Sequence, residues 1–203
     1  MSKMRVLALV GVVVAVTVVQ LEASEITFNG FSYKQAVSIQ HNGTNLSVYA
    51  GAFLIDVDDQ PFTAFCVDLD HWMKNEWQGQ FAPVTTINNG LAAAYLYDHF
   101  MASVSSNDQA AGLQLAIWEV VDDYGSSISL DAGNFRFAST NGARTAAETY
   151  LAALPASLSG YTTNSVILTS GDSPRSQNLI VPEPATMVLM GLSILPLIMR
   201  RTR

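Results

Sequence analysis

Cysteine is nearly absent from this chain: Cys66 is the only one among 203 residues. A single cysteine excludes an internal disulfide. In an exported chain a free thiol is open to oxidation or mispairing. Cys66 therefore needs either burial as a small apolar residue or a chemical role, and its position alone leaves both interpretations open.

Basic residues are scarce as well, and half of them lie at the two ends of the chain. Between residues 24 and 180 there are five Lys and Arg against fifteen Asp and Glu. An acidic body repels nucleic acid and anionic lipid, so neither is expected as a partner. The chain also has no Gly-x-Ser-x-Gly nucleophile elbow and no His-Glu-x-x-His zinc motif, and we expect neither a metal nor a cofactor.

An uncharged apolar run, residues 6–19, stands near the N-terminus. Lys3 and Arg5 precede it, and a short polar stretch ending at Ala23 follows it. This order is that of a secretory signal peptide, which we assign to residues 1–23. An uncleaved N-terminal membrane helix is the alternative.

A second apolar run, residues 185–199, lies near the C-terminus and is shorter than the roughly 20 residues that a free-standing membrane helix needs. It follows the motif Val181-Pro182-Glu183-Pro184 and precedes Arg200 and Arg201. Arginines just after an apolar segment favour retention on the cytoplasmic side. We therefore expect residues 181–203 to hold a translocated chain in the membrane with its body outside; an ordinary tail anchor is the alternative.

This C-terminal segment resembles the PEP-CTERM sorting signal of Gram-negative bacteria in its proline motif, apolar stretch and terminal arginines. The resemblance implies processing by an exosortase-type membrane protease and a transient stay in the inner membrane. It also implies final delivery to the cell surface or the extracellular matrix.

The body, residues 24–180, is long enough for one domain and changes from strand-like to helical patterns along its length. Val, Ile, Phe, Tyr and Thr predict strands at 26–33, 36–40, 46–57, 61–69 and 80–87, with later ones at 165–169 and 177–181. His41-Asn42-Gly43 predicts a turn between the second and third of these strands. Helices are predicted at 91–104 and 143–154, and a third, capped by Asn107 or Asp108, is predicted to run to about Asp123. The expected fold class is α+β: an antiparallel β-rich half with an inserted group of about three helices, besides the signal peptide and a short transmembrane sorting helix.

Gln114 is the unusual residue of the predicted middle helix. At about 100° per residue it falls inside the apolar face, flanked by Val121 and Trp118. A buried carboxamide without partners costs about 1–3 kcal/mol. Gln114 therefore needs a hydrogen-bond network, a ligand or a covalent bond.

A covalent bond between Gln114 and Cys66 would remove both anomalies, because a thiolate can attack the carboxamide, expel ammonia and leave an internal thioester. The surrounding residues resemble the paired motifs of bacterial surface thioester domains. These motifs are Phe65-Cys66-Val67-Asp68 and Leu113-Gln114-Leu115-Ala116-Ile117-Trp118. Leu113 stands where that family often has threonine.

The resemblance implies a stored acyl group at Gln114. An amine or hydroxyl of a surface or matrix protein or polysaccharide would attack it and release Cys66. Such capture is used once, so we do not expect an enzyme. Supporting roles are expected for Phe65, Asp68 and Trp118, with the aromatic rings excluding water. His71 and His99 are the candidate bases, and an ordinary surface histidine is the alternative for each.

Two other functions stay open at this point. The first is a structural protein of the exopolysaccharide matrix, with Cys66 free or in an intermolecular disulfide. The second is a cysteine hydrolase that pairs Cys66 with a histidine.

Overall fold

The computed structural model describes residues 23–125 and 128–184. The expected signal peptide up to residue 22, the apolar run 185–199, and Arg200 and Arg201 lie outside the described residues. Within those two ranges no helix has the length and apolar character needed to cross a membrane.

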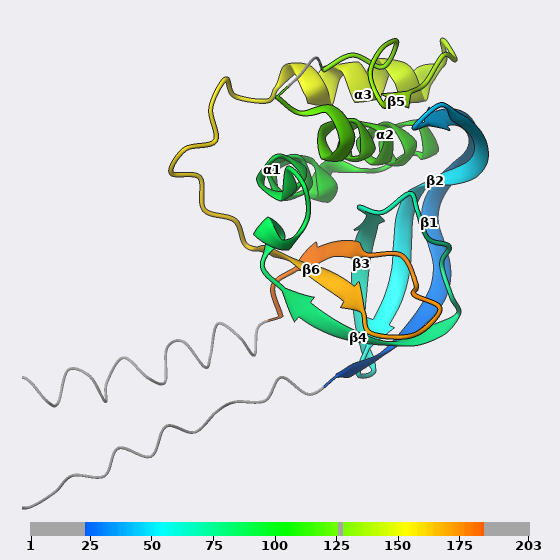
Figure 1. The fold of residues 1–203 in the computed structure, drawn as a ribbon, viewed down its shortest axis with the longest axis vertical. Coiled ribbons are helices and arrows are strands. Elements are labelled where there is room, and N and C mark those ends of the chain that lie inside the picture. The colour runs from blue at the N-terminus through cyan, green and yellow to red at the C-terminus, as the bar shows by residue number, and fades with distance from the viewer. Residues whose placement is uncertain (1–22, 126–127, 185–203) are drawn as a thin grey trace, which may run out of the picture.

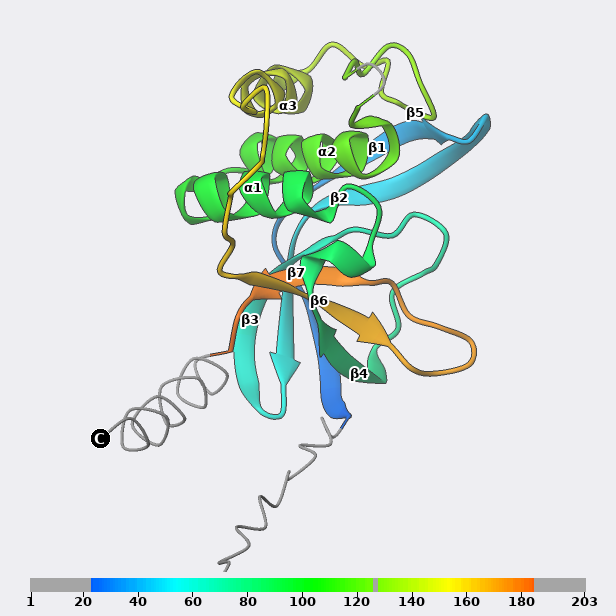
Figure 2. The ribbon, with the colours of Figure 1, turned by 60° about the vertical axis from the view of Figure 1, so that its left-hand side comes forward.

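The strands of the described residues form one antiparallel sheet in the order β2-β3-β7-β6-β4-β1-β5. Because β1 pairs with both β2 and β4, six of these strands close into a ring (Figure 2). Their bounds are β1 Ser24–His41, β2 Thr44–Val57, β3 Gln60–Cys66, β4 Glu76–Ala82, β5 Phe135–Arg136, β6 Ser165–Ser170 and β7 Leu179–Pro182.

The first two strands form one long, bent hairpin (Figure 1). The break predicted between residues 33 and 36 is wrong, because β1 continues without interruption. Register shifts at Phe28/Gly30 and Phe31/Tyr33 are bulges, which bend a strand without ending it. The predicted turn at Asn42-Gly43 is present, with both residues at positive φ, 49° and 79°, as tight hairpins require. The bend brings the hairpin against α2, residues Asn107–Asp123.

Three helices, α1 Gly90–Phe100, α2 and α3 Gly142–Ala152, lie together over one end of the sheet (Figures 1 and 2). They are inserted between β4 and β6, so the predicted α+β class with a group of three helices is confirmed for the described residues. Gly112 lets α3 approach α2 closely, because a Cβ there would lie 2.5 Å from Cβ of Ala146. The strand expected at 80–87 lies earlier, and Val84–Thr86 form a 3-10 turn instead.

β7, the last strand among the described residues, lies in the middle of the sheet. It pairs with β3 through Cys66↔Leu179 and with β6 through Val166↔Val181. Val181 is fully buried, and the N–H of Glu183 still donates to the carbonyl of Asn164 at 2.7 Å. The sheet therefore includes the first residues of the segment that the sequence assigned to sorting.

Candidate functional site

The start of α2 is fixed by polar side chains. Ser106 is the N-cap, one residue before the caps expected from the sequence, and its Oγ accepts the N–H of Gln109 at 3.2 Å. Gln109 Oε1 in turn accepts the N–H of Ser105 at 2.8 Å, so the two side chains act much like a capping box. This start sets which residues of α2 face the sheet, and Gln114 is among them.

Gln114 and Cys66, 48 residues apart in sequence, are in direct contact. The N–H of Cys66 donates to Gln114 Oε1 at 2.9 Å, and Gln114 Nε2 donates to the carbonyl of Cys66 at 2.7 Å. Both residues are fully buried. The side-chain amide of the helix is thus held against the main chain of the strand.

The Gln114 carboxamide takes the place of a neighbouring strand. β2 pairs with β3 only as far as Phe53↔Ala64, so it does not reach Cys66. On the opposite edge, the N–H of Val67 donates to the carbonyl of Asn178 at 3.0 Å. Hydrogen-bonding groups of successive residues point to opposite sides of an antiparallel strand. Gln114 therefore satisfies the groups of Cys66 that face away from β7.

The Cys66 thiol is held by the main chain of Asp68. Sγ donates to the Asp68 carbonyl at 2.9 Å and accepts the Asp68 N–H at 3.3 Å. Burial raises the pKa of the thiol to about 12, although the Asp68 N–H and the indole N–H of Trp118 both lower it. The thiol is thus protonated at neutral pH, and an attack by sulfur must be coupled to loss of that proton.

The side chain of Asp68 orients His71. Nδ1 of His71 donates to Asp68 Oδ2 at 2.8 Å, which leaves Nε2 free to accept a proton. The same carboxylate accepts the N–H groups of Asp70 at 2.9 Å and of Asn178 at 3.4 Å. One residue, Asp68, therefore links the thiol through its main chain to an oriented imidazole through its side chain.

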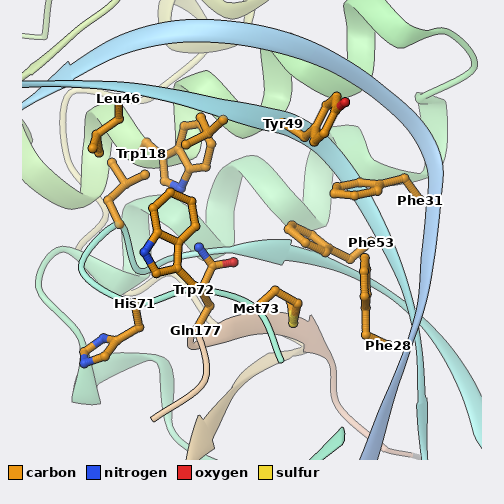
Figure 3. A pocket seen from close by; sticks show the side chains of 12 residues that line it. Phe28, Phe31, Leu46, Tyr49, Phe53, His71, Trp72, Met73, Trp118 and Gln177 are labelled. Atoms are coloured by element: carbon orange, nitrogen blue, oxygen red, sulfur yellow. The ribbon is translucent and has the colours of Figure 1, made fainter. Parts of the chain in front are cut away.

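Two clefts approach the pair from the surface, and both are lined by Trp118 and His71. Neither cleft is lined by Cys66 or Gln114, so the pair itself is closed off from both clefts. The first cleft, of about 230 Å³, is mainly apolar. In Figure 3 its aromatic side chains stand on two sides, with Trp72 and Trp118 opposite Phe28, Phe31, Tyr49 and Phe53.

The second cleft, of about 310 Å³, is polar and contains a histidine that the sequence analysis missed. Nε2 of His41 lies 3.2 Å from Asp122 Oδ2, and its Nδ1 lies 3.8 Å from Asp70 Oδ1. Burial raises the pKa of Asp122 to about 6, and His41 opposes that rise. No local sequence signal links residues 41 and 122, because only the bend of the β1–β2 hairpin brings them together.

Phe65 and His99, two residues expected at the site, lie apart from the Cys66 thiol. Phe65 is buried toward α1, edge-on to Tyr97 with ring centroids 6.1 Å apart. His99 stacks on Tyr95 at 4.0 Å and lines neither cleft. Of the two histidines considered as bases, the structure places only His71 beside the site. Among the described residues, no group of three or more His, Cys, Asp and Glu side chains is arranged to hold a metal ion.

No family model matches this sequence, and no curated protein matches it. Among solved structures, the N-terminal thioester domain of a surface protein from Clostridium perfringens is similar to this chain, with a TM-score of 0.40. The two share 16% sequence identity, over 66% of this chain and 87% of that one.

Proposed function

We propose that this chain is an exported surface or matrix protein that attaches covalently to a partner through a thioester between Cys66 Sγ and Gln114 Cδ. One observation carries the proposal. The only thiol of the chain lies on the residue that binds Gln114, the one buried side-chain carboxamide of the described residues. The pair sits in a dry core, where a reactive acyl group is kept from water.

Formation of the thioester balances within the pair. Sγ bonds to Cδ, the C–N bond of the carboxamide breaks, and the thiol proton leaves with ammonia. The two hydrogen bonds between Gln114 and Cys66 hold the reacting residues side by side, which supplies the proximity that a reaction of this kind needs. The thioester then joins β3 to α2.

Capture would use an amine or a hydroxyl of the partner, entering through the clefts beside Trp118. The nucleophile bonds to Cδ, the C–S bond breaks, and the sulfur takes the electron pair and finally a proton. Nε2 of His71, free because Nδ1 donates to Asp68, would remove the proton of the attacking group. The acyl group is used once, so the protein is not a turnover enzyme.

The proposal also includes an address. Val181-Pro182-Glu183-Pro184, the apolar run and the terminal arginines support sorting by an exosortase-type membrane protease of a Gram-negative cell. The chain would cross the inner membrane, be held there transiently by its tail, and end at the cell surface or in the extracellular matrix. Its covalent target would be a protein or polysaccharide of that surface or matrix.

A structural protein of the matrix without a thioester is the second candidate. One observation favours it: the Gln114 carboxamide is fully engaged with the main chain of Cys66, so the pair is satisfied without a covalent bond. Intact mass separates the two candidates, because a thioester lacks one ammonia and hydrogen bonding changes no mass.

The first prediction therefore concerns the mass and the thiol of the freshly purified mature chain. We expect a mass one ammonia below that of the sequence, and no labelling of Cys66 when the chain is unfolded in a thiol reagent. Methylamine should add to Gln114 and free one thiol. A chain of full sequence mass whose thiol labels completely would contradict the thioester and favour the structural candidate.

A further inference from the structure

The main chain of Cys66 offers one donor and one acceptor to the side chain of Gln114. Its N–H donates to Oε1 at 2.9 Å, and its carbonyl accepts a hydrogen of Nε2 at 2.7 Å. Both residues are fully buried, so a donor or acceptor left unpaired at this point is costly. The two groups are therefore matched by an oxygen beside a nitrogen that carries hydrogen.

Under the proposed function, capture of an amine is the reverse of thioester formation. Formation starts from the carboxamide that the structure shows and expels its Nε2 as ammonia. In capture, the nitrogen of the partner bonds to the same Cδ of Gln114 and expels the same sulfur. Because a reaction and its reverse share their intermediates, the incoming nitrogen should pass through the place that Nε2 holds beside the Cys66 carbonyl.

We propose that the main-chain N–H and carbonyl of Cys66 select primary amines as the nucleophile. The inference rests on the proposed function. The nitrogen lone pair bonds to Gln114 Cδ, and the π electrons of the acyl group move to Oε1, where the Cys66 N–H stabilises the negative charge. One hydrogen of the nitrogen goes to a base, and another donates to the Cys66 carbonyl. The acyl carbonyl then re-forms, the C–S bond breaks, its electron pair goes to Sγ, and the proton on the base finally reaches the sulfur.

The number of hydrogens on the attacking atom is what this arrangement distinguishes. A primary amine carries two, one for the base and one for the Cys66 carbonyl. A secondary amine or an alcohol carries one, so the buried carbonyl is left unpaired when the base removes it. Water also carries two, so burial of the pair has to protect the thioester from hydrolysis.

The test uses the full chain loaded with the thioester and three small amines. Ethylamine and dimethylamine are isomers of similar basicity, but only ethylamine is primary. Isopropylamine is primary and more branched than ethylamine, so it reports the effect of bulk alone. The rate of thiol release by each amine is divided by its rate with a small thioester in solution, which removes differences in intrinsic reactivity.

We expect the preference for ethylamine over dimethylamine to be about 10-fold larger on the protein than in solution, which corresponds to about 1.4 kcal/mol, the size of one hydrogen bond. Isopropylamine should behave like ethylamine. Equal normalised rates for ethylamine and dimethylamine, or equal rejection of dimethylamine and isopropylamine, would overturn the selection while leaving the thioester in place. A wild-type chain that keeps its ammonia would instead overturn the proposed function and this inference with it.

A change of the main chain tests the acceptor itself. Replacing Val67 by its α-hydroxy acid makes the Cys66 carbonyl an ester carbonyl, which is a weaker acceptor, and removes the N–H that donates to Asn178 at 3.0 Å. The same replacement at Ala64, which pairs with Phe53 and lies on the same strand, is the matched control. The preference for ethylamine should fall in the Val67 variant and persist in the Ala64 variant. An unchanged preference in the loaded Val67 variant would contradict the role of the carbonyl, and the comparison of amines on the wild-type chain decides the case if that variant does not load.

Discussion

Glu119, next to Trp118 on α2, is a buried polar side chain whose ionisation depends on its surroundings. It is fully buried, and its Oε1 accepts the N–H of Ser129 at 2.7 Å. Burial raises its pKa to about 7, the hydrogen bond from Ser129 opposes that rise, and the charges of Asp123 and Asp122 add to it. Its ionised form is therefore disfavoured in the folded protein.

This pKa predicts how stability changes with pH. The folded value of about 7 lies above the ordinary value of 4.5, so the unfolded chain loses the proton first as pH rises. The free energy of unfolding should therefore fall between those two pH values. Glu119→Gln keeps an acceptor for Ser129 and removes the titration. We expect it to flatten this slope and to raise stability above pH 7 by about 1–3 kcal/mol, measured by urea unfolding at several pH values.

Glu148→Gln is the matched control for Glu119→Gln. Glu148 is exposed and pairs with Arg144 at 2.7 Å, so its loss should change stability by no more than about 0.5–1 kcal/mol and leave the slope in place. Asp122, whose pKa is also raised, keeps part of the slope in both variants. A Glu119→Gln protein with the wild-type slope would show that Glu119 does not carry this pH dependence.

Single residues with a local signature could be predicted from the sequence, and residues placed by tertiary structure could not. Gln114 was found because the period of a helix assigns it to the buried face, and the turn at Asn42-Gly43 because its conformation demands those residue types. Asn178 and His41 carry no such signal. Their contacts with the site depend on the register of β7 and on the bend of β1.

Among the elements, β7 is the one on which the surroundings of Cys66 depend. It is the last strand along the described chain, yet it lies between β3 and β6. Just before it, Asn178 binds the main chain of Val67 and the carboxylate of Asp68. The strand that carries Cys66 is therefore completed only when the C-terminal part of the body has joined the sheet.

This arrangement predicts different outcomes on the two sides of Pro182. Val181 is fully buried in a central strand, so Val181→Asp places a charge in the core and should destabilise the protein by several kcal/mol and abolish the thioester. Alanines at Pro182, Glu183 and Pro184 should preserve the fold and the thioester but leave the chain uncleaved in the inner membrane. Urea unfolding, intact mass and membrane fractionation measure the three properties.

The triple-alanine variant separates sorting from folding. Ser165↔Pro182 is the last pair of β6 with β7, and proline donates no N–H to it, so alanine removes no hydrogen bond there. Normal processing and surface delivery of this variant would count against the sorting signal. A folded Val181→Asp protein that still loses ammonia would show that β7 is not needed for the site.

The strand prediction was wrong where a strand continues through residues whose composition does not favour a strand. The sequence suggested two strands in place of β1 because Lys34 and Gln35 interrupt its apolar pattern. In the structure both residues continue the pairing with β2, opposite Gly51 and Ala50, and bulges absorb the irregularity. The interruption of the pattern reflects solvent exposure on one stretch of the hairpin, not the end of a strand.

For the molecule as a whole, the positions of the site and of the end of β7 bear on the proposed attachment. The described chain leaves the sheet after β7 on the side away from the helices, whereas Gln114 lies on α2 (Figures 1 and 2). A tail held in a membrane would therefore present the helical side outward. A thioester would also join this side to the sheet, because Cys66 belongs to β3 and Gln114 to α2.

The last prediction tests attachment by the intact protein. Cys66→Ala removes the sulfur and Gln114→Ala removes the acyl carbon, so both should lose all SDS-resistant adducts with cell-surface or matrix material. Both should still fold and be exported. Relative to the thioester, which has already lost Gln114 Nε2 as ammonia, Gln114→Ala leaves the N–H of Cys66 without the Gln114 oxygen, at about 1–3 kcal/mol. Losing the cross-link adds an amount comparable to a disulfide, about 2–4 kcal/mol.

The free energy of unfolding alone poorly distinguishes the loss of hydrogen bonding from the loss of the cross-link. Capture of a partner distinguishes them well. Gln109→Ala, a change of the partly exposed glutamine on the first turn of the same helix, weakens the α2 cap but leaves the pair intact, so it should capture at the wild-type level. Equal and complete loss in the Cys66 and Gln114 variants, with normal capture by the Gln109 variant, assigns the chemistry to the pair. A Gln114→Ala chain that still forms adducts at the wild-type level would place the attachment chemistry elsewhere in the molecule.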